Sequence, residues 1–260
     1  MRARRVAVLL LLLALPFAAA ACGGSKKSST TATTTASAVS PADAVKAAAQ
    51  KTAGAGSVRM TLGVSGTSST NSRIEVSGAG GFDTAKREGQ LRLRFSVSGV
   101  SGTMDVVLSG TDLYLRSPLL SIALPQGKSW IKVDVSKSAK AGGLDLSTIL
   151  SNDPTQALGA LQNVGEVTEV GRAQVGGAMV THYRARVAGT TSKSGGVYDV
   201  WVGDDGYIHR VRTVVAGTGS TTGAVRATSN LSGFGEPVTV TVPPASQTAT
   251  SNGSIPGLGG

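Results

Sequence analysis

Hydrophobic residues occupy every second position over long stretches of the chain. The segments from Val58 to Val64 and from Leu91 to Val97 alternate apolar side chains with polar residues, arginine or glycine. Because successive side chains of a strand point to opposite faces of its sheet, this pattern predicts strands with one buried and one solvated face. Further segments of the same character are Arg73–Ser77, Thr103–Leu108, Asp112–Arg116, Trp130–Val135, Val164–Val170, Met179–Val187, Val197–Val202, Tyr207–Val215, Ala224–Leu231 and Val238–Val242.

The connections between these segments are short and rich in turn residues. Gly110–Thr111 and Asp204–Gly206 are examples, and we also interpret the glycine-rich stretch Gly78–Gly81 as a turn. Short connections favour antiparallel pairing of consecutive strands. The pattern therefore predicts one large antiparallel meander.

Two segments depart from the period of two and predict helices. Ser40, Pro41 and Asp43 have the spacing of an N-cap, a first helical position and a capping-box carboxylate. A second helical segment is predicted from Leu144 to about Val164, with Asp153 and Pro154 as a cap and first-turn pair. Helices that are segregated from an antiparallel sheet define an α+β fold, and these helices must cover its apolar side.

Composition divides the chain into four parts. Residues 1–21 have the order of a secretory signal: basic Arg2, Arg4 and Arg5 and then an apolar run. Residues 22–39 are mainly Gly, Ser, Thr, Ala and Lys, which predicts a flexible tether. Residues 40–244 form a single domain, and residues 245–260 are predicted to be a disordered tail.

Cys22 is the one cysteine of the chain and follows Ala19, Ala20 and Ala21 directly. This junction resembles the bacterial lipobox, in which the cysteine is lipidated, and it predicts a lipoprotein on the extracytoplasmic face of the cell membrane. The alternatives are an ordinary cleaved signal or a transmembrane anchor, but the apolar run is shorter than the roughly 20 residues of a spanning helix. A single cysteine also excludes an intramolecular disulfide and a cysteine-based zinc site.

The order of several segments resembles the actinobacterial lipoproteins of the LppX and LprG family, which are related in fold to the LolA and LolB lipoprotein carriers. These segments are the lipobox and tether, the Ala-rich first helix, Asp112–Leu115, Trp130–Val133, the central helices, Val200–Tyr207, Gly235–Val238 and Pro243–Pro244. The resemblance implies a twisted antiparallel half-barrel whose concave face is covered by helices. It also implies binding of acylated lipids in the cavity between sheet and helices.

The apolar positions of the sheet and central helices supply candidate residues for such a cavity. They are Leu62, Leu93, Phe95, Met104, Val106, Leu115, Ile131, Leu146, Ile149, Leu150, Leu158 and Leu161. An incompletely filled apolar space would accept alkyl chains of a lipid or glycolipid. The alternative is a normally packed core, in a structural or sensory lipoprotein that binds an envelope protein and no lipid.

Other functional classes find little support in the sequence. His182 and His209 lie within predicted strands without an acid and nucleophile pattern, which argues against an enzyme and gives no catalytic residues. Trp130 and Trp201 can contact acyl chains, pack a second small core or lie at a membrane interface. The formal net charge of +10 has two interpretations. The basic side chains lie on solvated strand faces, or they bind anionic polymers of the envelope. We expect a monomer with no cofactor, no metal and no nucleic-acid partner.

Replacement of the anchor residue tests the lipoprotein hypothesis. We expect Cys22→Ser to leave an unprocessed or released protein, because a serine hydroxyl cannot form the thioether that carries diacylglycerol. Membrane fractionation and the mass of the mature N-terminus measure both effects. Equal processing and membrane attachment of the variant and the wild type would show that Cys22 is not the anchor.

Overall fold

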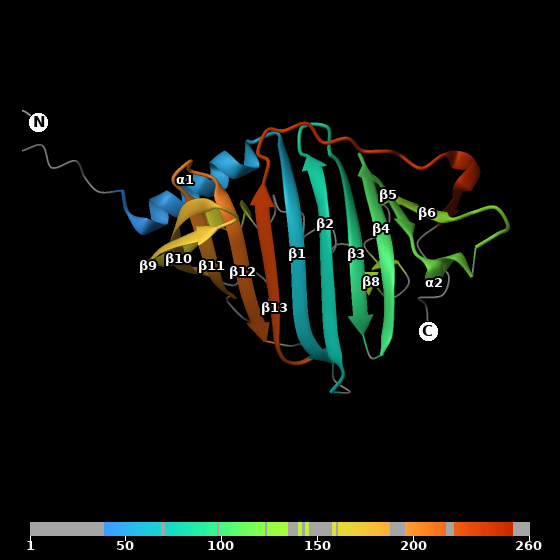
Figure 1. The fold of residues 1–260 in the computed structure, drawn as a ribbon, viewed down its shortest axis with the longest axis horizontal. Coiled ribbons are helices and arrows are strands. Elements are labelled where there is room, and N and C mark those ends of the chain that lie inside the picture. The colour runs from blue at the N-terminus through green and yellow to red at the C-terminus, as the bar shows by residue number, and fades with distance from the viewer. Residues whose placement is uncertain are drawn as a thin grey trace, which may run out of the picture. The chain divides into compact units, whose positions relative to one another are not determined.

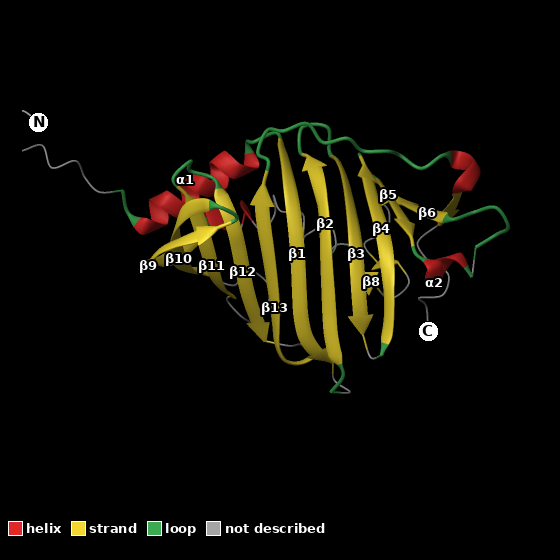
Figure 2. Ribbon diagram, viewed as in Figure 1, coloured by secondary structure: helices red, strands yellow, loops and turns green. Residues whose placement is uncertain are grey.

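One open sheet of twelve strands makes up most of the described chain in this computed structural model (Figures 1 and 2). The structure describes residues 39–251 apart from positions 69–70, 98, 123, 135–139, 142–143, 146–157, 160, 188–195 and 217–220. The sheet is twisted and almost wholly antiparallel, and helices are few. The predicted α+β half-barrel is therefore confirmed.

Two antiparallel meanders form this sheet. The first contains β1 (Ser57–Ser68), β2 (Arg73–Asp83), β3 (Glu88–Val97), β4 (Val100–Ser109), β5 (Asp112–Arg116) and β6 (Trp130–Asp134). The second contains β9 (Val164–Val175), β10 (Ala178–Val187), β11 (Gly196–Gly203), β12 (Ile208–Ala216) and β13 (Thr221–Ser232). Antiparallel pairing of β1 with β13 joins the two meanders, so the order is β14-β6-β5-β4-β3-β2-β1-β13-β12-β11-β10-β9.

Helix α1 (Pro41–Ala53) begins where the sequence predicts it. Ser40 is the N-cap, and its Oγ accepts a hydrogen bond from the backbone N–H of Asp43 at 3.1 Å. Val45, Ala48 and Ala49 form the buried side of the helix, which packs against β9, β10, β11 and β12. The narrow, alanine-rich stripe lets the helix approach the sheet closely.

The two faces of the sheet differ in chemistry. We call the face that carries Met60, Leu91 and Val106 the inner face, because α1 packs on that side, and we call the opposite face the outer face. The register places Met60 beside Leu231 and Leu91 beside Val106, so the alternation predicted from sequence continues across neighbouring strands. Apolar side chains gather on the inner face, while most arginines of the strands lie on the outer face.

The second predicted helical segment differs from the structure. Leu144–Asp145 is strand β8, which pairs with β7 (Lys140–Ala141) in a separate two-stranded sheet. A helix therefore does not begin at Leu144, because the backbone there is extended and paired with β7. Positions 158, 159, 161 and 162 are helical, whereas the predicted caps within 146–157 lie outside the described residues. A short helix that the sequence did not indicate, α2 (Pro118–Ser121), follows β5.

The glycine-rich stretch Gly78–Gly81 is not a turn but part of strand β2. Large side chains of the neighbouring strand lie over these glycines. A Cβ on Gly78 would lie 2.5 Å from Cδ2 of Leu93, and a Cβ on Gly102 of β4 would lie 2.7 Å from Cζ of Phe95. Glycine is needed at these positions because of close cross-strand packing rather than because of turn geometry.

The segment after β13 crosses the outer face, and we call residues 237–247 the strap. Figure 1 shows it running along the ends of β1 to β4 towards β6. The prediction of a strand at Val238–Val242 is wrong, since these residues pair with no strand of the sheet. Their alternation reflects packing on one side only: Val238 lies against Gly81, and Val240 packs against a small buried cluster of Val107, Tyr114 and Trp130.

The composition predicted a disordered tail from residue 245, but the strap leads into regular secondary structure there. The 3-10 helix η1 (Ala245–Gln247) leads into β14 (Thr248–Ser251), which pairs in parallel with β6. Nζ of Lys128 donates to the carbonyl oxygens of Ala245 and Ser246 at 3.1 and 2.9 Å. Ladder hydrogen bonds are made by the backbone, so a Ser/Thr/Ala sequence can add to an exposed strand edge despite its low hydrophobicity.

Removal of the C-terminal strand tests its contribution to stability. A chain ending at Pro244 should lose about 2 kcal/mol of unfolding free energy, because several backbone hydrogen bonds of about 1 kcal/mol each disappear. A chain ending at Ser251 retains β14 and is the matched control. Urea unfolding followed by circular dichroism measures both, and equal midpoints for the two truncated chains would show that β14 does not stabilise the domain.

Candidate functional site

The inner face carries a buried apolar cluster beneath α1. It contains Val45 and Ala49 of the helix, Met60 and Leu231 of the paired central strands, and residues of β10 to β12. Leu158 and Leu161, both predicted cavity residues, are fully packed here. This end of the sheet is therefore a filled core.

A second inner-face cluster lies on β4, β5 and β6. Val106, Leu115 and Ile131, three more of the predicted residues, are buried in it together with Leu113 and Val133. Leu120 of α2 covers part of the cluster. Leu91 packs against both clusters and so connects them, although the sequence analysis did not single it out.

Between the two clusters the inner face is apolar but only half-buried. The remaining described candidates, Leu62, Leu93, Phe95 and Met104, all have intermediate exposure. Leu93 and Met104 are cross-strand neighbours and pack against the second cluster. These four side chains make up what we call the inner band.

Small residues make the inner band shallow. Gly78, Gly80 and Gly102 belong to the inner face, as their pairing with Leu93, Leu91 and Phe95 shows. These positions have no side chains, so the side chains of the neighbouring Leu93 and Phe95 lie directly over the backbone of Gly78 and Gly102. The inner band is thus a broad apolar surface rather than an interdigitated core.

Four of the predicted site residues cannot be placed. Leu146, Ile149 and Leu150 of the central segment, and the predicted anchor Cys22, lie outside the described residues. Their roles in ligand binding and in lipidation remain predictions.

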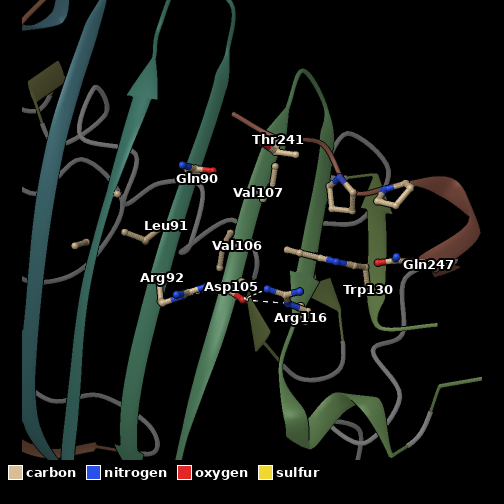
Figure 3. Close-up of a pocket in the computed structure, with 14 residues that line it drawn as sticks. Gln90, Leu91, Arg92, Asp105, Val106, Val107, Arg116, Trp130, Thr241 and Gln247 are labelled. Carbon is tan, nitrogen blue, oxygen red and sulfur yellow. Dashed lines mark hydrogen bonds and ion pairs between the residues drawn. The ribbon is translucent and has the colours of Figure 1, made fainter. Parts of the chain in front are cut away.

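The outer face carries a pocket that the sequence analysis did not anticipate (Figure 3). Its volume is about 530 Å³, within the range of small-molecule sites. It lies between the sheet and the strap. The lining residues are Ala79, Gly80, Gln90, Leu91, Arg92, Asp105, Val106, Val107, Arg116, Trp130, Thr241, Pro243, Pro244 and Gln247. Of the predicted cavity residues only Val106 is among them.

Three charged side chains from neighbouring strands meet in this outer pocket. Nε of Arg92 donates to Oδ1 of Asp105 at 2.6 Å, and Nε and Nη2 of Arg116 donate to Oδ2 at 3.0 and 2.6 Å (Figure 3). Burial raises the pKa of Asp105, but the hydrogen bonds from the two guanidinium groups outweigh this effect and hold the pKa below its ordinary value. The three residues lie 13 and 11 positions apart in sequence, so only the strand register brings them together.

Trp130 supports one side of this charge cluster. The guanidinium carbon of Arg116 lies 4.6 Å from the centre of the Trp130 ring, which is a cation–π contact. The tryptophan itself is only 7% exposed and packs with Val107, Tyr114 and Val240. Of the three roles open to Trp130 from sequence, the structure shows packing of a second small core.

A similar cluster occupies the other end of the outer face. Trp201 stacks on the ring of His182 with centroids 4.3 Å apart, and the guanidinium carbons of Arg210 and Arg212 lie 5.5 and 5.2 Å from its centre. Trp201 also packs against Val180 and other residues in a small buried cluster. It has the same structural role as Trp130.

Asp199 holds this second cluster together. Its carboxylate pairs with Nε2 of His182 at 2.9 Å, Nε of Arg184 at 3.1 Å and Nη2 of Arg212 at 3.2 Å. Burial raises the pKa of Asp199, but the hydrogen bonds from His182, Arg184 and Arg212 lower it by more. The pKa of Asp199 is therefore below its ordinary value. We assign this cluster a structural role, because Asp199 ties together side chains of β10 and β12 on either side of its own strand.

Both histidines are largely buried. The side chains of His182 and His209 are 15% and 13% exposed. His209 pairs with Asp205 of the turn between β11 and β12, and the carbonyl of Asp205 accepts a hydrogen bond from Nζ of Lys51. These contacts fasten the predicted hairpin turn Asp204–Gly206 to the end of α1.

Neither a metal cluster nor a membrane-spanning helix is found in the described part of the chain. No group of three or more His, Cys, Asp or Glu side chains there has the arrangement of a metal site. None of the helices described here is both long and apolar enough to cross a membrane.

Comparisons with known proteins concern the fold. No protein-family model matches the sequence, and no curated protein matches it significantly. Among solved structures, the lipoprotein LppX of Mycobacterium tuberculosis is 15% identical, with a TM-score of 0.46, over 77% of this chain and 98% of that one. LprF of Mycobacterium bovis is 13% identical, with a TM-score of 0.48, over 78% and 96%.

Another solved structure is similar at a lower level. A LolA superfamily protein of Nitrosomonas europaea is 6% identical, with a TM-score of 0.26, over 71% of this chain and 91% of that one. The structures similar to this chain thus include members of the groups that the order of sequence segments resembles.

The Asp199 cluster predicts a pH-dependent stability. At pH 7, Asp199→Asn should cost about 2 kcal/mol, because charge-assisted hydrogen bonds of about 1.5 to 3 kcal/mol lose their anion. A depressed folded-state pKa stabilises the protein above the unfolded-state value of about 3.9, and this contribution disappears as the pH falls through the folded-state pKa.

The difference between variant and wild type should therefore be full at pH 7 and shrink below about pH 4. Denaturant unfolding across this pH range measures it. Asp204→Asn removes the exposed ion pair with Arg172 and is the control, with an expected cost of about 0.5 kcal/mol or less. An Asp199→Asn effect that did not change with pH would contradict the ionic role of this carboxylate.

Proposed function

We propose that the protein is a lipid-anchored envelope lipoprotein that binds acyl chains of a lipid or glycolipid on the inner band. In this proposal it carries or presents the ligand at the extracytoplasmic face of the cell membrane, with Cys22 as the anchor. The observation that carries the proposal is the inner band itself, where adjacent strands present apolar side chains that are only half-buried.

Hydrophobic burial supplies the driving force for such binding. Each methylene that leaves water contributes about 0.8 kcal/mol, so an acyl chain needs only a continuous apolar surface and no specific polar partner. The inner band provides this surface between two clusters that are already packed. Because Gly78 and Gly102 have no side chains, the inner face is shallow there and an alkyl chain has room to lie along the strands.

The opposite face is a poor candidate for an acyl chain. Its apolar groups, such as Trp130 and Trp201, are buried beneath arginines, and the outer pocket contains three charged side chains. Transfer of an alkyl chain to that face would desolvate charges without compensation. The proposal therefore assigns the acyl chain to the inner band.

The decisive experiment is identification of the bound material. A chain beginning at Val39, the start of the compact unit that extends to Gly260, should be purified without detergent and extracted with organic solvent. Mass spectrometry of the extract is expected to show stoichiometric acylated lipid. An extract without lipid, together with no binding of a fluorescent acyl probe, would favour the alternative of a scaffold that binds a protein partner.

A pair of adjacent residues on opposite faces gives a sharper test. Met104→Glu places a carboxylate in the inner band, where an acyl chain would desolvate it, and should weaken binding of a fluorescent fatty acid at least tenfold. Thr103→Glu adds the same charge at an exposed position of the outer face and should leave binding unchanged. Fluorescence titration measures affinity, and thermal melting verifies that both variants fold. Equal affinities for the two variants would contradict the inner band as the lipid site.

A further inference from the structure

We propose that the outer pocket binds a small organic molecule through an oxyanion, such as a phosphate ester or a carboxylate. Arg92 and Arg116 are the residues that would hold this group. The inference is independent of the proposed lipid site, which lies on the other face of the sheet.

The outer pocket is enclosed by two different parts of the chain. Residues of β2 to β6 form its floor, and Thr241, Pro243, Pro244 and Gln247 of the strap form its roof. A volume of about 530 Å³ accommodates a molecule the size of a sugar phosphate rather than a single ion.

The charge balance favours an anion. Arg92 and Arg116 face one carboxylate, Asp105, which is the one acidic residue among the described residues that line the pocket. Asp105 accepts hydrogen bonds at both oxygens, whereas each guanidinium has five N–H donors. The side chains of Arg92 and Arg116 are 64% and 43% exposed, so these arginines remain accessible to a ligand.

The accessible groups favour an oxyanion over a neutral sugar. A sugar site needs an exposed aromatic face, but the Trp130 ring is 7% exposed and lies beneath the Arg116 guanidinium. The planar fork of a guanidinium matches the oxygens of phosphate and carboxylate groups. Gln90 and Gln247 line the same space and can donate amide hydrogen bonds to the rest of the ligand.

The outer pocket is already organised for binding. Asp105 fixes both arginines, and stacking on Trp130 further orients Arg116. Pro243 and Pro244 restrict the roof, while Lys128 and the pairing of β14 with β6 hold its far end. Groups that are ordered before binding lose less conformational entropy when the ligand arrives.

Calorimetric titration of the purified full-length protein in a nonionic detergent tests the proposal. The probes are glycerol 3-phosphate and, as a membrane source of the same chemistry, short-chain phosphatidylglycerol, with glycerol as the neutral comparison. We expect saturable binding of at least one anionic probe and none of glycerol. Failure of both anionic probes to bind would overturn the proposal, and the identity of the one that binds distinguishes a soluble ligand from a lipid headgroup.

Three variants locate the binding site. Arg92→Gln should weaken binding about tenfold, and the fold should be retained because Asp105 keeps Arg116 as a partner. Thr241→Trp should abolish binding, because the new side chain fills the space under the strap without changing the charge. Arg94→Gln removes an exposed arginine two residues away that does not line the pocket and should have little effect.

The comparison with Arg94→Gln separates a site from general surface charge. Equal losses in Arg92→Gln and Arg94→Gln, or unchanged binding in Thr241→Trp, would overturn the assignment. Binding of a fluorescent fatty acid to the inner band is measured separately. A negative result for one proposed site therefore does not affect the test of the other.

Discussion

Pairing of β1 with β13 is the interaction on which the rest of the fold depends. It joins the two meanders edge to edge in one sheet, and it sets Met60 beside Leu231 and Thr61 beside Asn230. Nδ2 of Asn230 donates to Oγ1 of Thr61 at 3.0 Å across this junction. The paired residues are 169 positions apart, so the junction depends on non-local contacts, which are typical of slowly folding sheets. The core beneath α1 draws residues from both sides of the junction and cannot form without it.

The alternation of the strands gives each face its own chemistry. An open sheet of this width has two large faces, and the described helices cover only parts of one. The inner face is filled by side chains at its two ends and is left shallow at its centre, where glycines of β2 and β4 lie beside Leu93 and Phe95. The outer face is covered in part by the strap, which packs through Val238 and Val240 and leaves a pocket beside them. One sheet can therefore present an apolar surface and a charged pocket without interference between them.

Local patterns in the sequence predicted the strands and the first helix well. Period-two alternation identified β1 and β3, and Ser40 and Asp43 marked the start of α1, because these signals arise from residues close in sequence. Predictions failed where the cause is non-local. The glycines of β2 looked like a turn because the side chain that packs over Gly78, Leu93, comes from another strand. β14 has no apolar pattern, since its stability comes from backbone pairing at the edge of β6.

The same limit applies to the candidate site. Apolar residues of the inner face could be named from sequence, but alternation alone cannot tell a packed position such as Leu161 from a half-buried one such as Met104. That difference depends on which element lies above each position. The charge cluster of the outer pocket was missed for a related reason: Arg92, Asp105 and Arg116 look like ordinary solvated residues until the register of β3, β4 and β5 aligns them.

One carboxylate at each end of the outer face organises several cations. Asp105 pairs with two arginines, and Asp199 pairs with two arginines and with His182. In both cases the hydrogen bonds to the carboxylate hold the pKa of the acid below its ordinary value despite burial. Each cluster keeps an excess of positive charge, and each places arginine over a buried tryptophan. The two clusters nevertheless differ in what surrounds them. The Asp105 cluster lies beside the strap, and together they line the outer pocket, which is the observation behind the proposed oxyanion site.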